Sequence, residues 1–240
     1  MNLCLPRLRV PLREQRSAYE PLMRNIQQAR LIFINLREEI LDPFFADSGF
    51  LRSKRSYIYR KKSENYLQEI WVEPNFREHS LGPVDMDIDP VFRWKLPAIK
   101  NIVLELTGND EFLVGGTPDL VVAQSVRFFV AGKSSLPWRV RTHQDCELVG
   151  RDICQFISKH IFPMLGDMKN IDDFINLYEA DDQRIWKQQH RYVFVAAAYL
   201  LSEQIERAHH VMDTHLGRPG LRKQYAPVFK RLNQLRAEGL

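Results

Sequence analysis

The sequence predicts an α+β fold with an N-terminal helix, an antiparallel sheet of about four to six strands, and a C-terminal helical extension containing an αα-hairpin. Two observations lead to this prediction. Apolar residues recur at helical spacing near the start and over the last third of the chain. Between these regions, side chains alternate with a period of two. Elements segregated in this way favour an antiparallel sheet.

The N-terminal region predicts an arm followed by one long helix. Residues 1–16 contain two prolines and no clear period, so we expect an irregular arm. The helical pattern starts at Ser17, which with Glu20 resembles a capping box, and it ends at Ser48-Gly49. The apolar positions of this helix are Leu22, Ile26, Ala29, Phe33, Leu36, Ile40 and Phe44.

Strand-like alternation follows in five segments: "RSYIYRKK", "YLQEIWVEP", "VDMDIDPVFRWK", "VRFFVAG" and "WRVRT". The second segment places Leu67, Glu69, Trp71 and Glu73 on one face. The short linker "GKSSL" between the last two segments carries Gly132 and predicts a hairpin. The segment "NIVLEL" fits either a strand or a turn of helix.

From about Leu148 the pattern is helical again. The segment "WKQQHRYVFVAAAYLLSEQ" is strongly apolar, and its helical spacing predicts that Phe194, Ala197 and Leu201 are buried. The next segment, "IERAHHVMDTHL", should pack back on it as an αα-hairpin. A last helix follows the break at Gly217.

No Pro/Ser-rich linker divides the chain, so we expect residues 17–240 to form a single α+β domain. Residues 17–147 would supply the helix and sheet, and residues 148–240 the helical part.

Composition indicates a water-soluble protein. Hydrophobic residues make up 45% of the 240 residues and charged residues 27%, which is typical of globular chains. No apolar run approaches the ~18–20 residues that span a bilayer. The start lacks an apolar core of signal-peptide length, and the three cysteines match no zinc spacing. We therefore expect a cytoplasmic protein that has no membrane partner.

"GPVDMDIDP" places Asp85, Asp87 and Asp89 on one side of a strand, with neighbouring residues of that side about 6.5–7 Å apart. Paired carboxylates can hold Mg²⁺ for phosphoryl or nucleotidyl transfer. The Gly-Ser or Gly-Gly turn that such transferases need upstream is missing. The favoured interpretation is a strand whose aspartates face water while Val84, Met86 and Ile88 face the core.

Three other patterns are incomplete as active sites. Gly132-Lys133-Ser134 lacks the glycine five residues upstream and the following helix of a phosphate-binding loop. Pro118, Asp119 and Lys133 fit a nuclease pattern only if Ala131 were acidic. The histidine-rich group on one helix needs a further ligand to bind zinc. Its members are His209, His210, Asp213 and His215. We therefore predict no catalytic residues, no metal site and no cofactor.

A basic segment offers a binding surface instead. Within residues 52–62, cations interleave with two tyrosines, whose rings could stack on bases. The candidate binding residues are Arg52, Arg55, Tyr57, Tyr59, Arg60 and Lys61, together with the aspartates Asp85, Asp87 and Asp89. Clustered cations can attract phosphates or an acidic protein.

One resemblance adds to this interpretation. The segment "ILDPFFADSGFLRSKRSYIYRKKSENYLQEIWVEP" resembles the start of a bacterial family known only as domain-of-unknown-function family 4304. The matching positions are Gly49-Phe50, Lys54-Arg55 and Tyr59-Arg60, and "LPWRVRT" and "IFPML" resemble its later part. The likeness covers roughly residues 30–180. It implies an α+β fold, contributes no catalytic residue, and suggests an immunity protein, since small bacterial families of this kind often accompany toxins.

Three functions follow from these patterns. The first is a non-catalytic protein-binding module, such as an inhibitor or immunity protein, with an acidic or neutral partner. The second is nucleic-acid binding through the cluster Arg52–Lys62. The third is a metal-dependent transferase centred on Asp85 and Asp87.

Overall fold

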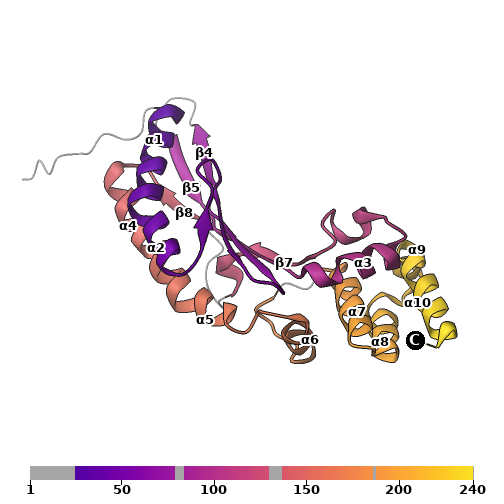
Figure 1. Ribbon diagram of the computed structural model, residues 1–240. Coiled ribbons are helices and arrows are strands. Elements are labelled where there is room, and N and C mark those ends of the chain that lie inside the picture. Colours follow the sequence, from indigo (N-terminus) through magenta and orange to yellow (C-terminus); the bar gives the residue numbers. More distant parts are fainter. Residues whose placement is uncertain (1–24, 79–83, 130–136, 186–187, 240) are drawn as a thin grey trace, which may run out of the picture.

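The chain has the predicted α+β architecture in a computed structural model that describes residues 25–78, 84–129, 137–185 and 188–239 (Figure 1). Helices α1, α2 and α4 lie at one end of the strands, and α3 with α7, α8, α9 and α10 lies at the other. None of the helices in these ranges is long and apolar enough to cross a bilayer.

The helices of the N-terminal and central parts are short and partly irregular. They are α1 (Ile26–Leu36), a π-helical turn (Arg37–Leu41), α2 (Asp42–Asp47), α3 (Lys100–Thr107), α4 (His143–Phe156), a second π-helical turn (Ile157–Ile161), α5 (Phe162–Leu165) and α6 (Ile171–Glu179). Short 3₁₀ turns of three or four residues lie at Pro97–Ile99, Glu111–Val114 and Val126–Phe129. The C-terminal helices are α7 (Arg191–Leu201), α8 (Ile205–Leu216), α9 (Pro219–Gln224) and α10 (Ala226–Glu238).

The strands form two antiparallel sheets. The strands are β1 (Leu51–Arg52), β2 (Ile58–Lys62), β3 (Leu67–Trp71), β4 (Pro74–Glu78), β5 (Val84–Ile88), β6 (Val91–Lys95), β7 (Leu120–Ser125) and β8 (Trp138–Val140). The five-stranded sheet has the order β1-β2-β3-β6-β7, and the three-stranded sheet has the order β4-β5-β8.

A long ribbon joins the two sheets. Strand β3 leads into β4 across two residues, and β5 leads into β6 across Asp89 and Pro90. β3 pairs with β6, and β4 pairs with β5. Side-chain alternation persists across both junctions: even-numbered residues such as Ile70, Val72 and Met86 are buried in the core. Successive strand residues point to opposite faces, so the odd-numbered residues share the other face.

Helices cover the core side of this ribbon. α1 contacts β4 and β5, and α4 packs on α1 and on β8. Farther along, the Gln68 side-chain amide donates to the carbonyls of Leu165 and Met168 at 3.1 and 2.9 Å. The rings of Trp94 and Phe174 meet edge to face, which attaches α6 to the sheet.

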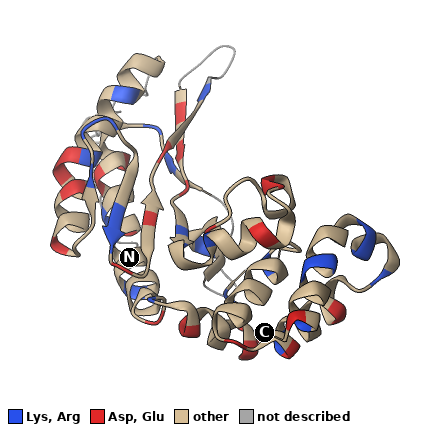
Figure 2. Ribbon diagram, turned by 45° about the vertical axis from the view of Figure 1, so that its right-hand side comes forward, with Lys and Arg blue, Asp and Glu red and all other residues tan. Residues whose placement is uncertain are grey.

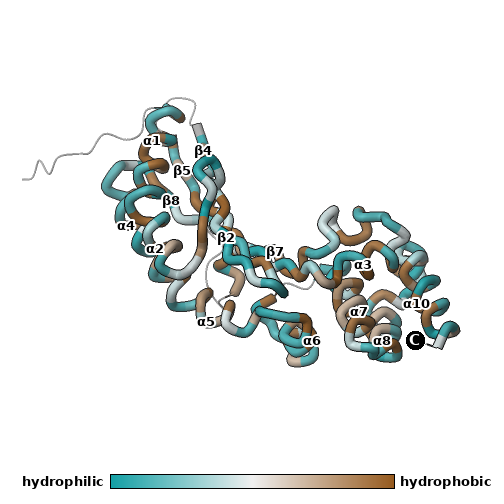
Figure 3. Tube along the Cα trace, viewed as in Figure 1, coloured by the Kyte–Doolittle hydropathy of each residue, from teal (hydrophilic) through white to brown (hydrophobic). Residues whose placement is uncertain are grey.

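The apolar helix α7 is the centre of the C-terminal helices (Figure 3). It packs on α3, α6 and α8, and α10 packs on α3 and α8. The αα-hairpin of α7 and α8 is therefore confirmed. Phe194 and Ala197 are buried as predicted, but the prediction for Leu201 is wrong because its side chain, in the last turn of α7, is 38% exposed.

The helix end at Ser48 is confirmed, whereas the expected start at Ser17 and Glu20 lies outside the described residues. α1 is capped by Asn25, whose side-chain oxygen accepts from the Gln28 N–H at 2.8 Å. The segment "NIVLEL" forms most of α3.

The strand expected at "VRFFVAG" is wrong. Residues Val126–Phe129 form a 3₁₀ turn after β7, and Val126 donates its N–H to the Pro90 carbonyl. The expected hairpin is also wrong, because β7 and β8 belong to different sheets. The linker around Gly132 lies outside the described residues.

Candidate functional site: an arginine–carboxylate network

Charged side chains from six strands and the residue after β8 lie on the face of the ribbon opposite the core helices. Figure 2 shows basic and acidic positions close together along these strands. Ion pairs join nine of them in two groups, one around Glu69 and one around Asp85 and Asp87. We call the two groups together the arginine–carboxylate network: Arg60, Glu69, Arg77, Asp85, Asp87, Arg93, Lys95, Arg139 and Arg141. Six cations thus surround three carboxylates, so the network carries a surplus of positive charge.

Asp87 lies between two arginines from neighbouring strands. Arg77 Nε on β4 is 2.7 Å from Asp87 Oδ2, and Arg139 Nε on β8 is 2.8 Å from Oδ1. Hydrogen bonding to Asp87 is the main cause that raises the pKa of Arg139. Both carboxylate oxygens are therefore engaged by cations.

Asp85 is held in the same way. Arg141 Nε lies 3.3 Å from Asp85 Oδ1, and Arg139 Nε lies 3.7 Å from Oδ2. Asp85 and Asp87 are only 4% and 3% exposed, so the expectation that they face water is wrong. The face was identified correctly, but arginines of β4 and β8 cover the carboxylates.

Asp89 differs from the other two aspartates. Its Oδ1 accepts a 2.6 Å hydrogen bond from the Ser125 hydroxyl, at the end of β7. This bond helps to fix the junction between β5 and β6, where the ribbon passes from one sheet to the other.

Glu69 forms the second centre of the network. Arg60 Nε lies 2.9 Å from its Oε1, while Arg93 and Lys95 approach Oε2 at 3.6 and 3.9 Å. The Arg93 guanidinium also lies 4.4 Å from the Trp71 ring centroid, over the ring. Glu69 is buried beneath these groups.

The four arginines closest to solvent share one geometry. Each places its Nε toward a buried carboxylate, and 40–54% of each side chain stays exposed. They are Arg60, Arg77, Arg139 and Arg141. A guanidinium has five N–H donors in a fixed plane, so a group oriented through Nε still presents donors to a partner.

Two members of the predicted basic cluster are structural instead. Arg52 Nε and Nη2 bond Asp42 at 2.9 and 2.7 Å, and Arg52 Nη1 bonds three backbone carbonyls. The Tyr59 hydroxyl donates to Asp42 at 2.7 Å, and its buried ring stacks on Phe45. Burial and this bond raise the pKa of Tyr59. Tyr59 therefore cannot stack on a base.

The remaining predicted residues are spread over different surfaces. Arg55 is exposed in the turn between β1 and β2. Tyr57 is 39% exposed and contacts Phe33 edge to face. Lys61 points to the opposite face from Arg60, where its Nζ donates to the Ser48 carbonyl at 3.3 Å. The basic segment is not one surface.

Sequence reasoning missed most of the network. A signal was present: "RWK" and "WRVRT" place cations at alternate positions, and β5 places aspartates at alternate positions in the same way. Only the pairing of β5 with β4 and β8 brings Arg77, Arg139 and Arg141 next to the aspartates.

The histidine-rich helix α8 places its histidines in different surroundings. His209 is buried, while the His215 ring stacks on Tyr192 and bonds the Tyr178 hydroxyl at 2.9 Å. Among the described residues, no three His, Cys, Asp or Glu side chains are grouped as metal ligands.

No protein-family model, curated protein or solved structure matches this chain.

Proposed function

We propose that the chain is a non-catalytic protein-binding module, of the inhibitor or immunity-protein kind, which recognises its partner through the arginine–carboxylate network. One observation carries this proposal: four half-exposed arginines are fixed through Nε on carboxylates that are only 3–5% exposed. Arginine is enriched at the energetic centres of protein interfaces.

Fixed arginines favour association for an entropic reason. Immobilising a flexible side chain at an interface costs about 0.5–1.5 kcal/mol. Here the buried carboxylates already hold the guanidinium groups, so much of that cost is met on folding. The surplus of cations over carboxylates suits a partner surface with exposed acidic groups.

The same contacts weigh against nucleic-acid binding. The ring of Trp71 is covered by the Arg93 guanidinium, and Tyr59 is buried. The case for the base-stacking surface that the sequence suggested is therefore weakened.

The contacts also weigh against a transferase centred on Asp85 and Asp87. Oxygens of both carboxylates are already paired with guanidinium groups. A divalent cation would have to displace them and overcome the charge of three neighbouring arginines.

An affinity experiment with matched baits tests the proposal. The wild-type chain and the variant Arg60→Glu/Arg139→Glu are immobilised, and proteins retained by the wild type alone are identified. Each is then purified and titrated calorimetrically against both chains. We expect the double charge reversal to weaken binding at least roughly a hundredfold, as expected when central arginines are lost.

A control variant distinguishes an effect of this face from an effect of net charge alone. Arg207 and Arg236 are exposed arginines of α8 and α10, paired with Glu179 and Glu206. Reversing both changes net charge equally but should leave affinity within about threefold, because such surface pairs contribute little. Equal losses for both double variants, or no protein retained by the wild type, would contradict the proposal.

A further inference from the structure

A pocket of about 420 Å³ lies where β2 and β3 meet α5 and the end of α2. Phe50, Tyr66 and Phe162 contribute aromatic walls, and Lys61 and Lys169 line it as cations. We call it the Lys61 pocket. Its volume falls within the range of about 300–1,000 Å³ that is typical of small-molecule sites. The arginine–carboxylate network uses none of these residues.

Lys61 places its ammonium group at this pocket. The Lys61 Nζ donates to the Ser48 carbonyl at 3.3 Å and lies 5.7 Å from the centroid of the Phe50 ring, and both residues line the pocket. An ammonium group has three N–H donors. Within the described ranges, the bond to Ser48 is the one hydrogen bond of this partly buried side chain. Donors of Lys61 therefore remain for a ligand.

The charge of the pocket is positive. Among the described residues that line it, Lys61 and Lys169 are charged and none is acidic. Neither lysine forms an ion pair with another described residue, whereas Arg60, next to Lys61, is paired with Glu69. Two cations that line one pocket repel each other, and both attract an anion. This lining favours a negatively charged ligand.

The walls suit a flat apolar body. Tyr66 and Phe162 are partly buried side chains that pack against the hydrophobic core, so each keeps some surface for a ligand. Aromatic rings pack on one another in offset-stacked or edge-to-face arrangements. Gln68 lies directly opposite Lys61 in the register of β2 and β3, and its amide is fixed by two bonds to backbone carbonyls of α5 and the turn after it. Part of the pocket is therefore rigid before a ligand binds.

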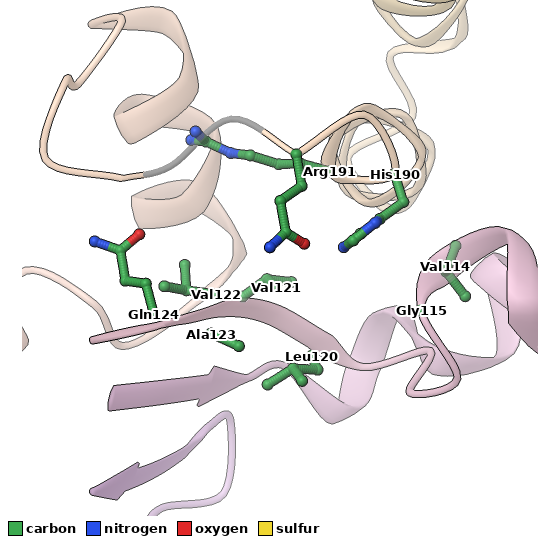
Figure 4. Close-up of a pocket in the computed structure, with 10 residues that line it drawn as sticks. Val114, Gly115, Leu120, Val121, Val122, Ala123, Gln124, His190 and Arg191 are labelled. Carbon is green, nitrogen blue, oxygen red and sulfur yellow. The ribbon is translucent and has the colours of Figure 1, made fainter. Parts of the chain in front are cut away.

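The cations of two other pockets are placed differently. In a pocket of about 210 Å³ between β7 and the start of α7, Arg191 directs its guanidinium away from His190 (Figure 4), and its Cζ lies 5.8 Å from the centroid of the Phe174 ring. In a pocket of about 600 Å³ between α3 and α10, Arg231 is paired with Glu105. Lys61 combines a head group at a pocket with the absence of a carboxylate partner among the described residues.

We propose that the Lys61 pocket binds an organic anion with a planar apolar body. Lys61 holds the anionic group, Lys169 attracts it, and the body packs against Tyr66 and Phe162. A carboxylate and a phosphate ester both supply this chemistry, because the oxygens of either group accept hydrogen bonds from an ammonium. This site shares no residue with the arginine–carboxylate network, so it can be occupied whether or not a protein partner is bound there.

Titration calorimetry of the full chain tests this assignment. The probe is benzoate, and the control is benzamide, which keeps the shape but lacks the charge. We expect saturable binding of benzoate and none of benzamide. Phenyl phosphate distinguishes the two sources of the anion: tighter binding than benzoate identifies a phosphate ester, and weaker binding identifies a carboxylate.

Two neighbouring lysines of β2 provide the decisive variants. Lys61→Gln should raise the Kd of the tighter of the two anions at least roughly tenfold, since a charge-assisted hydrogen bond is lost. Lys62→Gln is the matched control, because it changes net charge equally. Lys62 is exposed and, as the next residue of the strand, points to the opposite face. It should leave the Kd unchanged.

Three outcomes would overturn the proposal. They are no binding of either anion at millimolar concentration, equal binding of benzamide, and equal losses of affinity in Lys61→Gln and Lys62→Gln. If Lys61→Gln fails to fold, Lys169→Glu takes its place, because the Lys169 side chain is exposed. That charge reversal must weaken binding of the anion at least roughly tenfold, and an unchanged Kd would place the site elsewhere.

Discussion

Asp87 lies directly opposite Arg139 in the register of β5 and β8, and the Arg139 Nε lies 2.8 Å from Asp87 Oδ1. The same carboxylate accepts Arg77 from the strand on its other side. A carboxylate in the middle of a three-stranded sheet therefore joins both neighbours through side chains, in addition to the backbone ladder.

This arrangement predicts that Asp87→Asn destabilises the protein by about 1–3 kcal/mol, since a buried ion-pair partner is lost while the arginines remain able to reach water. Urea unfolding followed by circular dichroism measures the change. The control is Arg77→Gln, which removes a side chain that is 52% exposed and leaves Asp87 paired with Arg139. It should cost less than about 1 kcal/mol, and equal costs for the two variants would contradict the central role of Asp87.

Asp42 predicts a specific acid sensitivity. Burial alone would raise its pKa, but hydrogen bonds from Arg52 and Tyr59 outweigh burial and hold the pKa below the ordinary value of 3.8. A carboxyl whose pKa is lowered by folding adds stability above its unfolded pKa, and this stability is lost as pH falls through the folded pKa.

The free energy of unfolding of the wild type should therefore exceed that of Asp42→Asn at pH 6, and the difference should shrink as the pH falls below 3.8. Chemical unfolding of both chains between pH 2.5 and pH 6 measures it. A difference that stays constant over this range would mean that Asp42 contributes through packing rather than through its charge.

Helix α7 offers a matched pair of substitutions. Ala197 is fully buried, whereas Leu201 at the end of the helix is 38% exposed. Ala197→Arg should cost several kcal/mol or prevent folding, because it overpacks the core and buries a charge. Leu201→Arg should lower stability by about 1 kcal/mol or less, because its head group can reach water. Thermal unfolding of both variants gives the comparison, and similar Tm values would contradict this packing of α7.

Local pattern predicted many of the helices and strands, but it misassigned Val126–Phe129 as a strand and could not identify the partners of the charged residues. The period of two in residues 84–95 correctly separated Met86 from Asp85 and Asp87. It could not show that Arg139, 52 residues after Asp87, would cover the carboxylate. Whether the polar face of a strand is buried depends on the strands that pair with it. Here β5 pairs with β8, which is far from it in the sequence.

The last prediction separates protein recognition from nucleic-acid recognition. Labelled single-stranded and double-stranded DNA and RNA should bind no tighter than about 10 μM near physiological salt, which is the range of non-specific attraction. The physical reason is that Arg52 is committed to Asp42, Tyr59 is buried, and Lys61 points to the opposite face from Arg60. The cations of this segment therefore do not form one phosphate-binding surface.

Fluorescence anisotropy over a range of salt concentrations measures this binding. A dedicated site contacting about four phosphates would give a log–log slope near −3 to −4, because each neutralised phosphate releases counterions. Binding to a protein partner should respond to salt mainly through its on-rate. Arg55→Glu/Lys61→Glu is the informative variant, because it reverses the charge of one exposed cation, Arg55, and one partly buried cation, Lys61, of the basic segment. A submicromolar nucleic-acid complex that this double reversal abolishes would make the basic segment, rather than the arginine–carboxylate network, the functional surface.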